Sequence, residues 1–114
     1  FRLLRLHPVT RYADPLSFDL ENASLNRPPR YDAISYTWDD QSPEIEAYCE
    51  GLKFFVTKNC ARILSVLRRQ EEDTLVWIDQ ICINQASNED RDKNVAQMGV
   101  IYSRSRNVFI WTGE

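Results

Sequence analysis

The stretch Leu75-Val-Trp-Ile-Asp-Gln-Ile-Cys-Ile-Asn-Gln85 decides how this chain folds. It begins as an apolar run of strand-forming residues and then changes to the polar residues Asp79, Gln80, Asn84 and Gln85. An apolar run between two helical patterns is typical of a strand buried on both faces of a parallel sheet. In open α/β sheets, ligands bind just beyond the carboxyl ends of such strands. The stretch therefore predicts both an α/β fold and the position of a site.

A helix is predicted before this strand. Thr57 is a suitable N-cap. The side chains that follow form an apolar face at helical spacing: Cys60, Ile63, Leu64 and Leu67. Arg68 and Arg69 fall in the predicted last turn, where cations interact favourably with the helix dipole.

A second helix is predicted after the strand and continues to about Ser105. Ser87 and Asp90 resemble a capping box with Asp in place of Glu. The predicted apolar face of this helix consists of Val95, Met98, Ile101 and Tyr102. Its polar face consists of Glu89, Asp90, Asp92, Lys93 and Arg104. That face is either an interface or simply the solvated side of the helix.

Further strands are predicted around these helices. Residues 31–38 and 107–111 are rich in β-branched and aromatic residues, and we expect the second of them to be buried. Shorter strands are expected within residues 1–7 and 17–25, followed by a hairpin over residues 44–56. Because the last three strands alternate with helices, we predict an α/β domain with a short parallel sheet flanked by helices. The antiparallel N-terminal strands and the hairpin would be added at one edge.

Composition excludes several classes of protein. The 114 residues suffice for one domain with one core. A formal net charge of -3 and a pI of about 5.2 do not suit general binding to nucleic acid. No apolar run approaches the roughly 20 residues that span a bilayer. With three cysteines, no Cys-x-x-Cys spacing and one histidine, we predict neither a disulfide framework nor a metal site, but a reducing compartment, the cytoplasm.

Several blocks of the sequence closely resemble the fungal heterokaryon incompatibility (HET) domain. The matching blocks are Tyr31 to Trp38, Asn59 to Leu67, Val76 to Gln85, Arg91, Met98, Ile101-Tyr102 and Val108 to Gly113. They occur in the family's order and cover nearly the whole chain from about residue 28, and the Trp-Ile-Asp-x-x-Cys-Ile-Asn-Gln run is a specific signature. One departure is Asp39, which stands where the family usually has Gly, a residue that permits backbone angles Asp tolerates less well.

The resemblance implies that residues 1–114 form a single HET domain excised from a longer, multidomain protein. It implies an effector of non-self recognition in filamentous fungi that triggers programmed cell death. The expected partners are sensor or regulatory domains of the same or another chain, or a second copy of the domain. The family is also distantly similar to TIR domains, which have a flavodoxin-like sheet.

Whether the domain is an enzyme stays open, because some TIR domains hydrolyse NAD and others only assemble. The alternative function is therefore a TIR-like NAD(P) glycohydrolase, which causes toxicity by nucleotide depletion. NAD would then be a substrate, and no cofactor is firmly implied.

Carboxylates follow each of the three predicted parallel strands. Asp39 and Asp40 follow the first strand, Asp79 ends the second, and Glu114 follows the third. Gathered at one edge, they could bind ribose hydroxyls or stabilise a developing oxocarbenium ion, and Asp79 and Glu114 are the candidate catalytic residues. The alternative is that loops at strand ends are polar in any case, and that Asp79 accepts backbone N–H bonds from the next loop.

Aromatic and amide side chains near the same edge are candidates for ligand binding, together with Asp39. Trp38 and Trp111 could stack on a ring and form one wall of a pocket, and Tyr36 could do the same, although core packing is the favoured interpretation for all three. Asn84 and Gln85 could bind a base or an amide, because their side chains donate and accept at once. The alternative for both is loop bracing and helix capping.

Arg91 and Cys82 need separate arguments. Arg91 falls in the first turn of the second helix, where the dipole disfavours a cation. We therefore expect it to pair with a carboxylate such as Asp79, or else to bind a phosphate. Cys82 stands between two isoleucines with no basic neighbour in the sequence, so it is predicted to be a buried small apolar residue and not a nucleophile.

Overall fold

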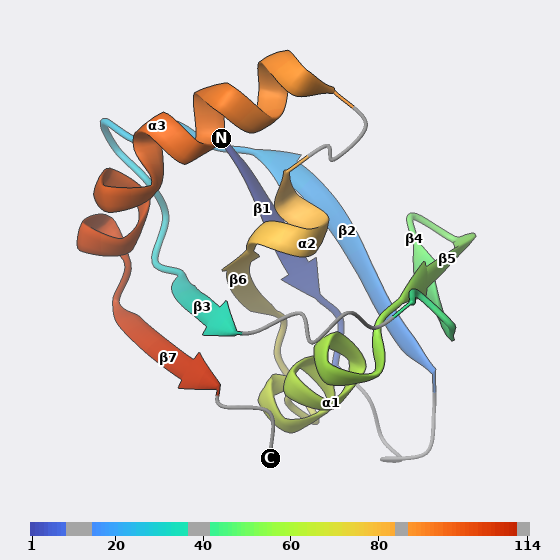
Figure 1. Ribbon diagram of the computed structural model, residues 1–114. Coiled ribbons are helices and arrows are strands. Elements are labelled where there is room, and N and C mark those ends of the chain that lie inside the picture. The colour runs from blue at the N-terminus through green and yellow to red at the C-terminus, as the bar shows by residue number, and fades with distance from the viewer. Residues whose placement is uncertain (9–14, 37–41, 84–86, 112–114) are drawn as a thin grey trace.

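The computed structural model describes residues 1–8, 15–36, 42–83 and 87–111 (Figure 1). In these residues, seven strands form one mixed sheet in the order β5-β4-β2-β1-β6-β3-β7. The strands are β1 (Arg2–Leu6), β2 (Leu16–Asn22), β3 (Asp32–Tyr36), β4 (Ile45–Cys49), β5 (Leu52–Val56), β6 (Thr74–Ile78) and β7 (Asn107–Trp111). The helices are α1 (Lys58–Leu67), α2 (Asp79–Cys82) and α3 (Asn88–Arg104).

Strands β6, β3 and β7 form the predicted parallel part of the sheet. β3 pairs in parallel with β6 on one side and with β7 on the other. In β6, Val76, Trp77 and Ile78 are fully buried, which confirms a strand covered on both faces. β3 lies between β6 and β7 in the sheet. The chain goes from β3 to β6 on one side and then crosses to β7 on the other side, so the direction in which strands are added reverses at β3. Such a reversal is the place where open α/β sheets bind ligands.

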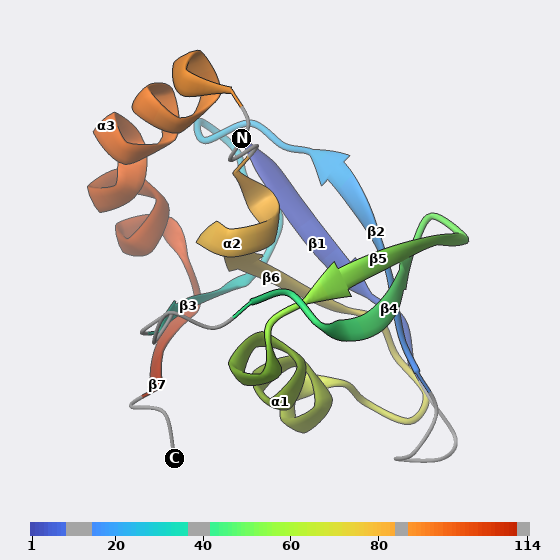
Figure 2. The same ribbon diagram turned by 45° about the vertical axis from the view of Figure 1, so that its right-hand side comes forward.

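The N-terminal strands and the hairpin extend one edge of the sheet, as predicted. β1 is antiparallel to both β6 and β2, and β4 and β5 form the expected antiparallel hairpin. The parallel pairing of β2 with β4 was not predicted. Figure 2 shows the hairpin beside β2. Its turn has φ of 53° at Glu50 and 80° at Gly51, the left-handed pair that matches the twist of a hairpin.

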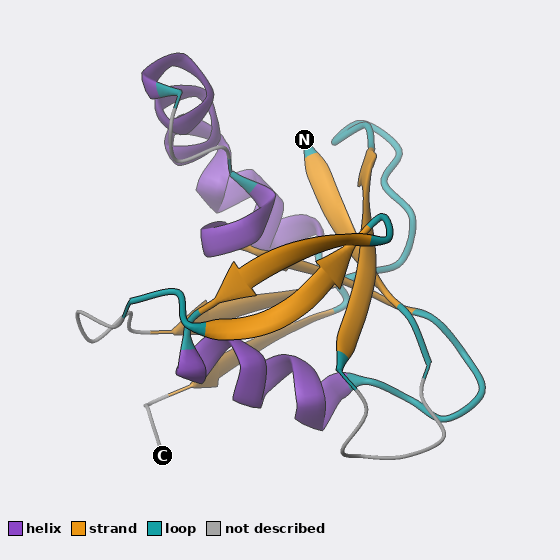
Figure 3. Ribbon diagram, turned by 90° about the vertical axis from the view of Figure 1, so that its right-hand side faces the viewer, coloured by secondary structure: helices purple, strands orange, loops and turns teal. Residues whose placement is uncertain are grey.

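Helices cover both faces of the sheet and give the molecule three layers. Figure 3 shows α1 on one side of the strands and α2 with α3 on the other. In α1, Thr57 is the N-cap, and Cys60, Ile63 and Leu64 are buried, as predicted. The predicted position of Arg68 and Arg69 in the last turn is wrong, because α1 ends at Leu67 and Arg68 is its C-cap.

The apolar face of α3 matches the prediction at Met98, Ile101 and Tyr102, which are buried or pack against the core, and differs from it at Val95. Ser87 caps the helix by accepting from the backbone N–H of Asp90, as predicted. Ile101 is buried, but Val95 is 57% exposed, and Asn94 takes the buried position. Neighbouring residues lie about 100° apart round a helix. The phase set by Ile101 therefore turns Asn94 inward and Val95 outward.

Strand β7 differs from its prediction as a buried strand. Val108, Phe109 and Ile110 are 45%, 42% and 77% exposed. β7 is the last strand of the sheet, and within the described residues it pairs only with β3. The apolar run predicted the strand correctly. The burial of β7, however, depends on whether another segment covers this edge of the sheet, and an apolar run does not report that.

Candidate functional site

The carboxyl ends of β6, β3 and β7 meet at one edge of the sheet, because the three strands are parallel (Figure 1). We name this region the carboxyl edge. Several predicted site residues lie outside the described residues: Trp38, Asp39, Asp40, Asn84, Gln85 and Glu114. The backbone of Tyr36 ends β3 in register with Trp111 of β7. The structure therefore places the edge itself and, of the predicted side chains, Asp79 and Arg91.

Asp79 stands at the carboxyl edge, but it begins α2 and does not end the strand. β6 ends at Ile78, and the carbonyl of Asp79 accepts from the backbone N–H of Ile83 at 3.2 Å. The residue is half-buried. A carboxylate in a first helical turn faces the positive end of the backbone dipoles, which stabilises its charge. The position therefore places a carboxyl group at the edge of the sheet.

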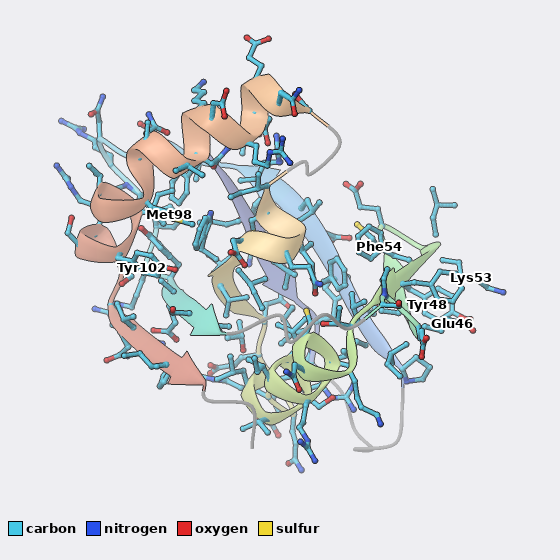
Figure 4. The ribbon with its side chains drawn as sticks, in the orientation of Figure 1. Glu46, Tyr48, Lys53, Phe54, Met98 and Tyr102 are labelled. Carbon is cyan, nitrogen blue, oxygen red and sulfur yellow. The ribbon has the colours of Figure 1, made fainter. Side chains whose placement is uncertain are left out.

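Tyr102 of α3 lies beside Asp79, although the sequence indicated only a core role for it. Its ring packs edge-on against Trp77, with 5.6 Å between ring centroids. Burial raises the pKa of Tyr102, its hydrogen bond with Ser35 of β3 lowers that pKa, and the charge of Asp79 raises it again. Figure 4 shows Tyr102 and Met98 projecting from α3 toward the sheet. Ser35 and Tyr102 therefore add two hydroxyl groups to the edge.

Gln80 joins the carboxyl edge to the start of α1. The Thr57 hydroxyl donates to Gln80 Oε1 at 3.1 Å and also accepts from the backbone N–H of Cys60 at 3.2 Å. One side chain thus caps α1 and holds α2. The sequence predicted the cap but not the second bond, because no local pattern reports a contact between residues 23 positions apart.

Arg91 and Cys82 take structural positions. Arg91 is exposed, and its guanidinium donates to the side chain of Asn88 one turn earlier. Among the described residues it does not pair with Asp79. Cys82 is fully buried, and burial raises the pKa of its thiol to about 12. The thiol stays protonated near neutral pH, so Cys82 is the predicted small apolar residue and no nucleophile.

The described part of the chain holds no cluster of three His, Cys, Asp or Glu side chains that could bind a metal ion. None of its helices is long and apolar enough to cross a membrane.

The described residues of the carboxyl edge offer a carboxylate from Asp79, an amide from Gln80, and two hydroxyls from Ser35 and Tyr102. These groups can orient a polar ligand and stabilise positive charge on it.

Comparison with known proteins shows which proteins this chain is similar to. The family model described as heterokaryon incompatibility protein (HET) matches residues 31–114. The heterokaryon incompatibility protein 6, OR allele, of Neurospora crassa is 40% identical over 125 residues, an alignment that covers 98% of this chain. The chain spans only 18% of that relative's length. No solved structure matches the chain, so the TIR-like sheet has no structural neighbour to support it.

Proposed function

The chain belongs to the heterokaryon incompatibility (HET) family, and we propose that it is the effector module of a fungal non-self recognition protein. In this proposal, its activation triggers programmed cell death through assembly or through binding of a partner. The observation that carries the proposal is the 40% identity with a heterokaryon incompatibility protein across nearly the whole chain. The partners would be sensor or regulatory domains of the same or another chain, or a second copy.

Edge strand β7 supports signalling by contact with another polypeptide. Its side chains Val108, Phe109 and Ile110 are exposed and apolar. An edge strand presents unpaired backbone groups that readily pair with another chain, and exposed apolar surface marks interaction sites. The strand thus combines the two features that a protein-binding surface needs.

Inducible expression of the full-length protein in a filamentous fungus tests the proposal. The measured quantity is the fraction of hyphal compartments that take up a vital dye. We expect the wild-type protein to raise this fraction and Ile110→Asp to abolish the rise. Leu52→Asp is the matched control, because Leu52 is 74% exposed on β5, the opposite edge strand, against 77% for Ile110 on β7.

Two results would contradict the proposal. The absence of cell death from a well-expressed wild-type protein would refute the effector role. Equal loss of killing in Ile110→Asp and Leu52→Asp, at equal protein levels, would refute signalling through β7.

The carboxyl edge favours a second candidate function, hydrolysis of NAD or a related nucleotide. Asp79 lies there on a strand switch point, where α/β sheets bind ligands. Its carboxylate would stabilise positive charge on the ribose as the nicotinamide departs. Glu114 would act with it, and Trp38 would stack on a base.

NAD turnover by the full-length protein, clustered through a fused oligomerisation domain, tests this second candidate. We expect Asp79→Asn to lower the rate at least about 100-fold, the usual effect of removing one preorganised electrostatic group. Asp92→Asn is the control, because Asp92 is an exposed acidic residue on α3. Absence of turnover by the wild-type protein would exclude the enzyme and leave the effector proposal untouched.

A further inference from the structure

A polar cavity of about 120 Å³ lies where the start of β1, the end of β2 and the first half of α3 come together. It is lined by Phe1, Arg2, Asn22, Asp90, Lys93, Asn94 and Gln97. None of the carboxyl-edge residues Ser35, Asp79 and Tyr102 lines it. We propose that this cavity binds a small free α-amino acid, a function separate from the effector role.

Asn94 gives the first reason to assign a ligand to the cavity. The residue is only 5% exposed, and its Nδ2 donates to the backbone carbonyl of Asp90 at 2.8 Å. That bond fixes which end of the amide is the oxygen. Asn94 Oδ1 is buried and has no hydrogen-bond partner among the described residues. A buried acceptor of this kind needs a donor. Asn94 is one of the residues that line the cavity, so in this proposal a ligand ammonium group donates to Oδ1 after a small shift of the side chain.

The charges around the cavity give the second reason. Arg2 and Lys93 are cations, and Asp90 is an anion that pairs with Arg2. A simple anion would meet the carboxylate of Asp90 and would leave Asn94 Oδ1 without a donor. A simple cation would be repelled by Arg2 and Lys93. A neutral polyol would bring no negative charge to pair with Lys93. A zwitterion places a carboxylate near Lys93 and an ammonium group near Asn94 and Asp90.

Size restricts the ligand further. A cavity of about 150 Å³ accommodates one benzene molecule, so the present cavity of about 120 Å³ suits a compact molecule. Glycine, alanine, serine and threonine fall in this range. The side-chain amides of Asn22 and Gln97 offer further donors and acceptors, which favours the hydroxyl-bearing members, serine and threonine.

Arg2 connects the cavity to the rest of the fold. Its Nη2 pairs with Asp90 of α3, and its Nε donates to the backbone carbonyl of Cys82 at 3.2 Å. The same guanidinium therefore touches the first turn of α3 and the end of α2. An amino acid bound beside it adds contacts between β1 and α3, so binding stabilises the folded state.

Isothermal titration of the full-length protein with glycine, alanine, serine and threonine tests the proposal. We expect at least one of them to bind with one-site stoichiometry. Two derivatives of the amino acid that binds serve as controls: the N-acetyl derivative lacks the ammonium charge, and the amide lacks the carboxylate. We expect each to bind at least about tenfold more weakly than the parent amino acid, because each loses a hydrogen bond that involves a charged group.

Variants locate the binding. Asn94→Leu removes the acceptor while filling a similar volume, and we expect at least about tenfold weaker binding. Lys93→Gln removes an exposed charge, and we expect about threefold weaker binding. Lys58→Gln, at an exposed lysine on α1, is the matched control and leaves the affinity unchanged. Should Asn94→Leu fail to fold, Lys93→Gln and the two ligand derivatives still decide the question.

Three outcomes would overturn the proposal. The first is that none of the four amino acids binds, in which case water fills the cavity. The second is that the N-acetyl derivative or the amide binds as tightly as the parent amino acid. The third is that a folded Asn94→Leu variant binds with wild-type affinity.

Discussion

Replacement of Thr57 tests whether one hydroxyl joins α1 to α2 at the carboxyl edge. Thr57 is 1% exposed, and its Oγ1 makes two bonds, to the Cys60 N–H at 3.2 Å and to Gln80 Oε1 at 3.1 Å. Thr57→Val keeps the shape of the side chain and removes both bonds. Thr57→Ser keeps the hydroxyl and removes only a methyl group. The pair of variants therefore separates hydrogen bonding from packing.

The expected magnitude follows from the two bonds. Loss of an N-cap costs about 1 kcal/mol, and loss of the bond to Gln80 costs about 1 kcal/mol more. We expect Thr57→Val to lower the free energy of unfolding by about 2 kcal/mol. We expect Thr57→Ser to lower it by less than about 1 kcal/mol. Gln80→Leu removes only the second bond and costs about 1 kcal/mol.

Urea denaturation followed by circular dichroism measures these differences. With an m-value of about 1.5 kcal/mol/M, Thr57→Val shifts the midpoint by about 1.3 M. The double variant Thr57→Val/Gln80→Leu should cost about 2 kcal/mol, because the shared bond is lost only once. Strict additivity of the two single variants would refute the link between α1 and α2. Equal losses in Thr57→Ser and Thr57→Val would refute the role of the hydroxyl in capping.

Three further predictions concern burial, charge and backbone strain. Iodoacetamide at pH 8 should label Cys82 only in the unfolded chain, as detected by mass spectrometry. Because the pKa of Cys82 is raised from 9.0 to about 12 in the fold, the free energy of unfolding should also fall between these pH values, and fall less in Cys82→Ala. Ile101→Glu should abolish cooperative thermal unfolding, whereas Val95→Glu should change the melting temperature by no more than a few degrees, because Val95 is exposed. Gly51→Ala should cost about 1 kcal/mol in urea denaturation through backbone strain alone, since φ is +80° and no atom lies within 4 Å of the added Cβ; an unchanged midpoint would contradict that assignment.

The sequence predicted those elements whose signal is local. The apolar run of β6 is buried on both faces because its composition suits no other environment. The turn at Glu50-Gly51 follows from the backbone angles that glycine permits. Thr57 and Ser87 cap their helices, because a side-chain oxygen beside free backbone N–H groups has a clear local role. These features need no knowledge of distant residues.

The features that the sequence did not predict depend on contacts between distant segments. Four residues are too few for a helical period, so α2 left no recognisable pattern. The exposure of β7 depends on its place at the edge of the sheet, which pairing alone decides. Tyr102 and Ser35 reach the carboxyl edge because α3 packs over β3, and neither residue type marks a site by itself.

The signature stretch that predicted the fold divides physically into two parts. Ile81, Cys82 and Ile83 are buried, so they anchor α2 to the sheet. Asp79 and Gln80 come directly before this anchor and stay half-exposed at the carboxyl edge. The burial of these apolar residues explains why α2 begins directly after β6. Because α2 begins there, the carboxylate of Asp79 and the amide of Gln80 stand where the parallel strands end. Among the described residues, Asp79 and Gln80 thus stand at this edge near the hydroxyls of Ser35 and Tyr102, and the cysteine between the isoleucines contributes only to the position of the first two.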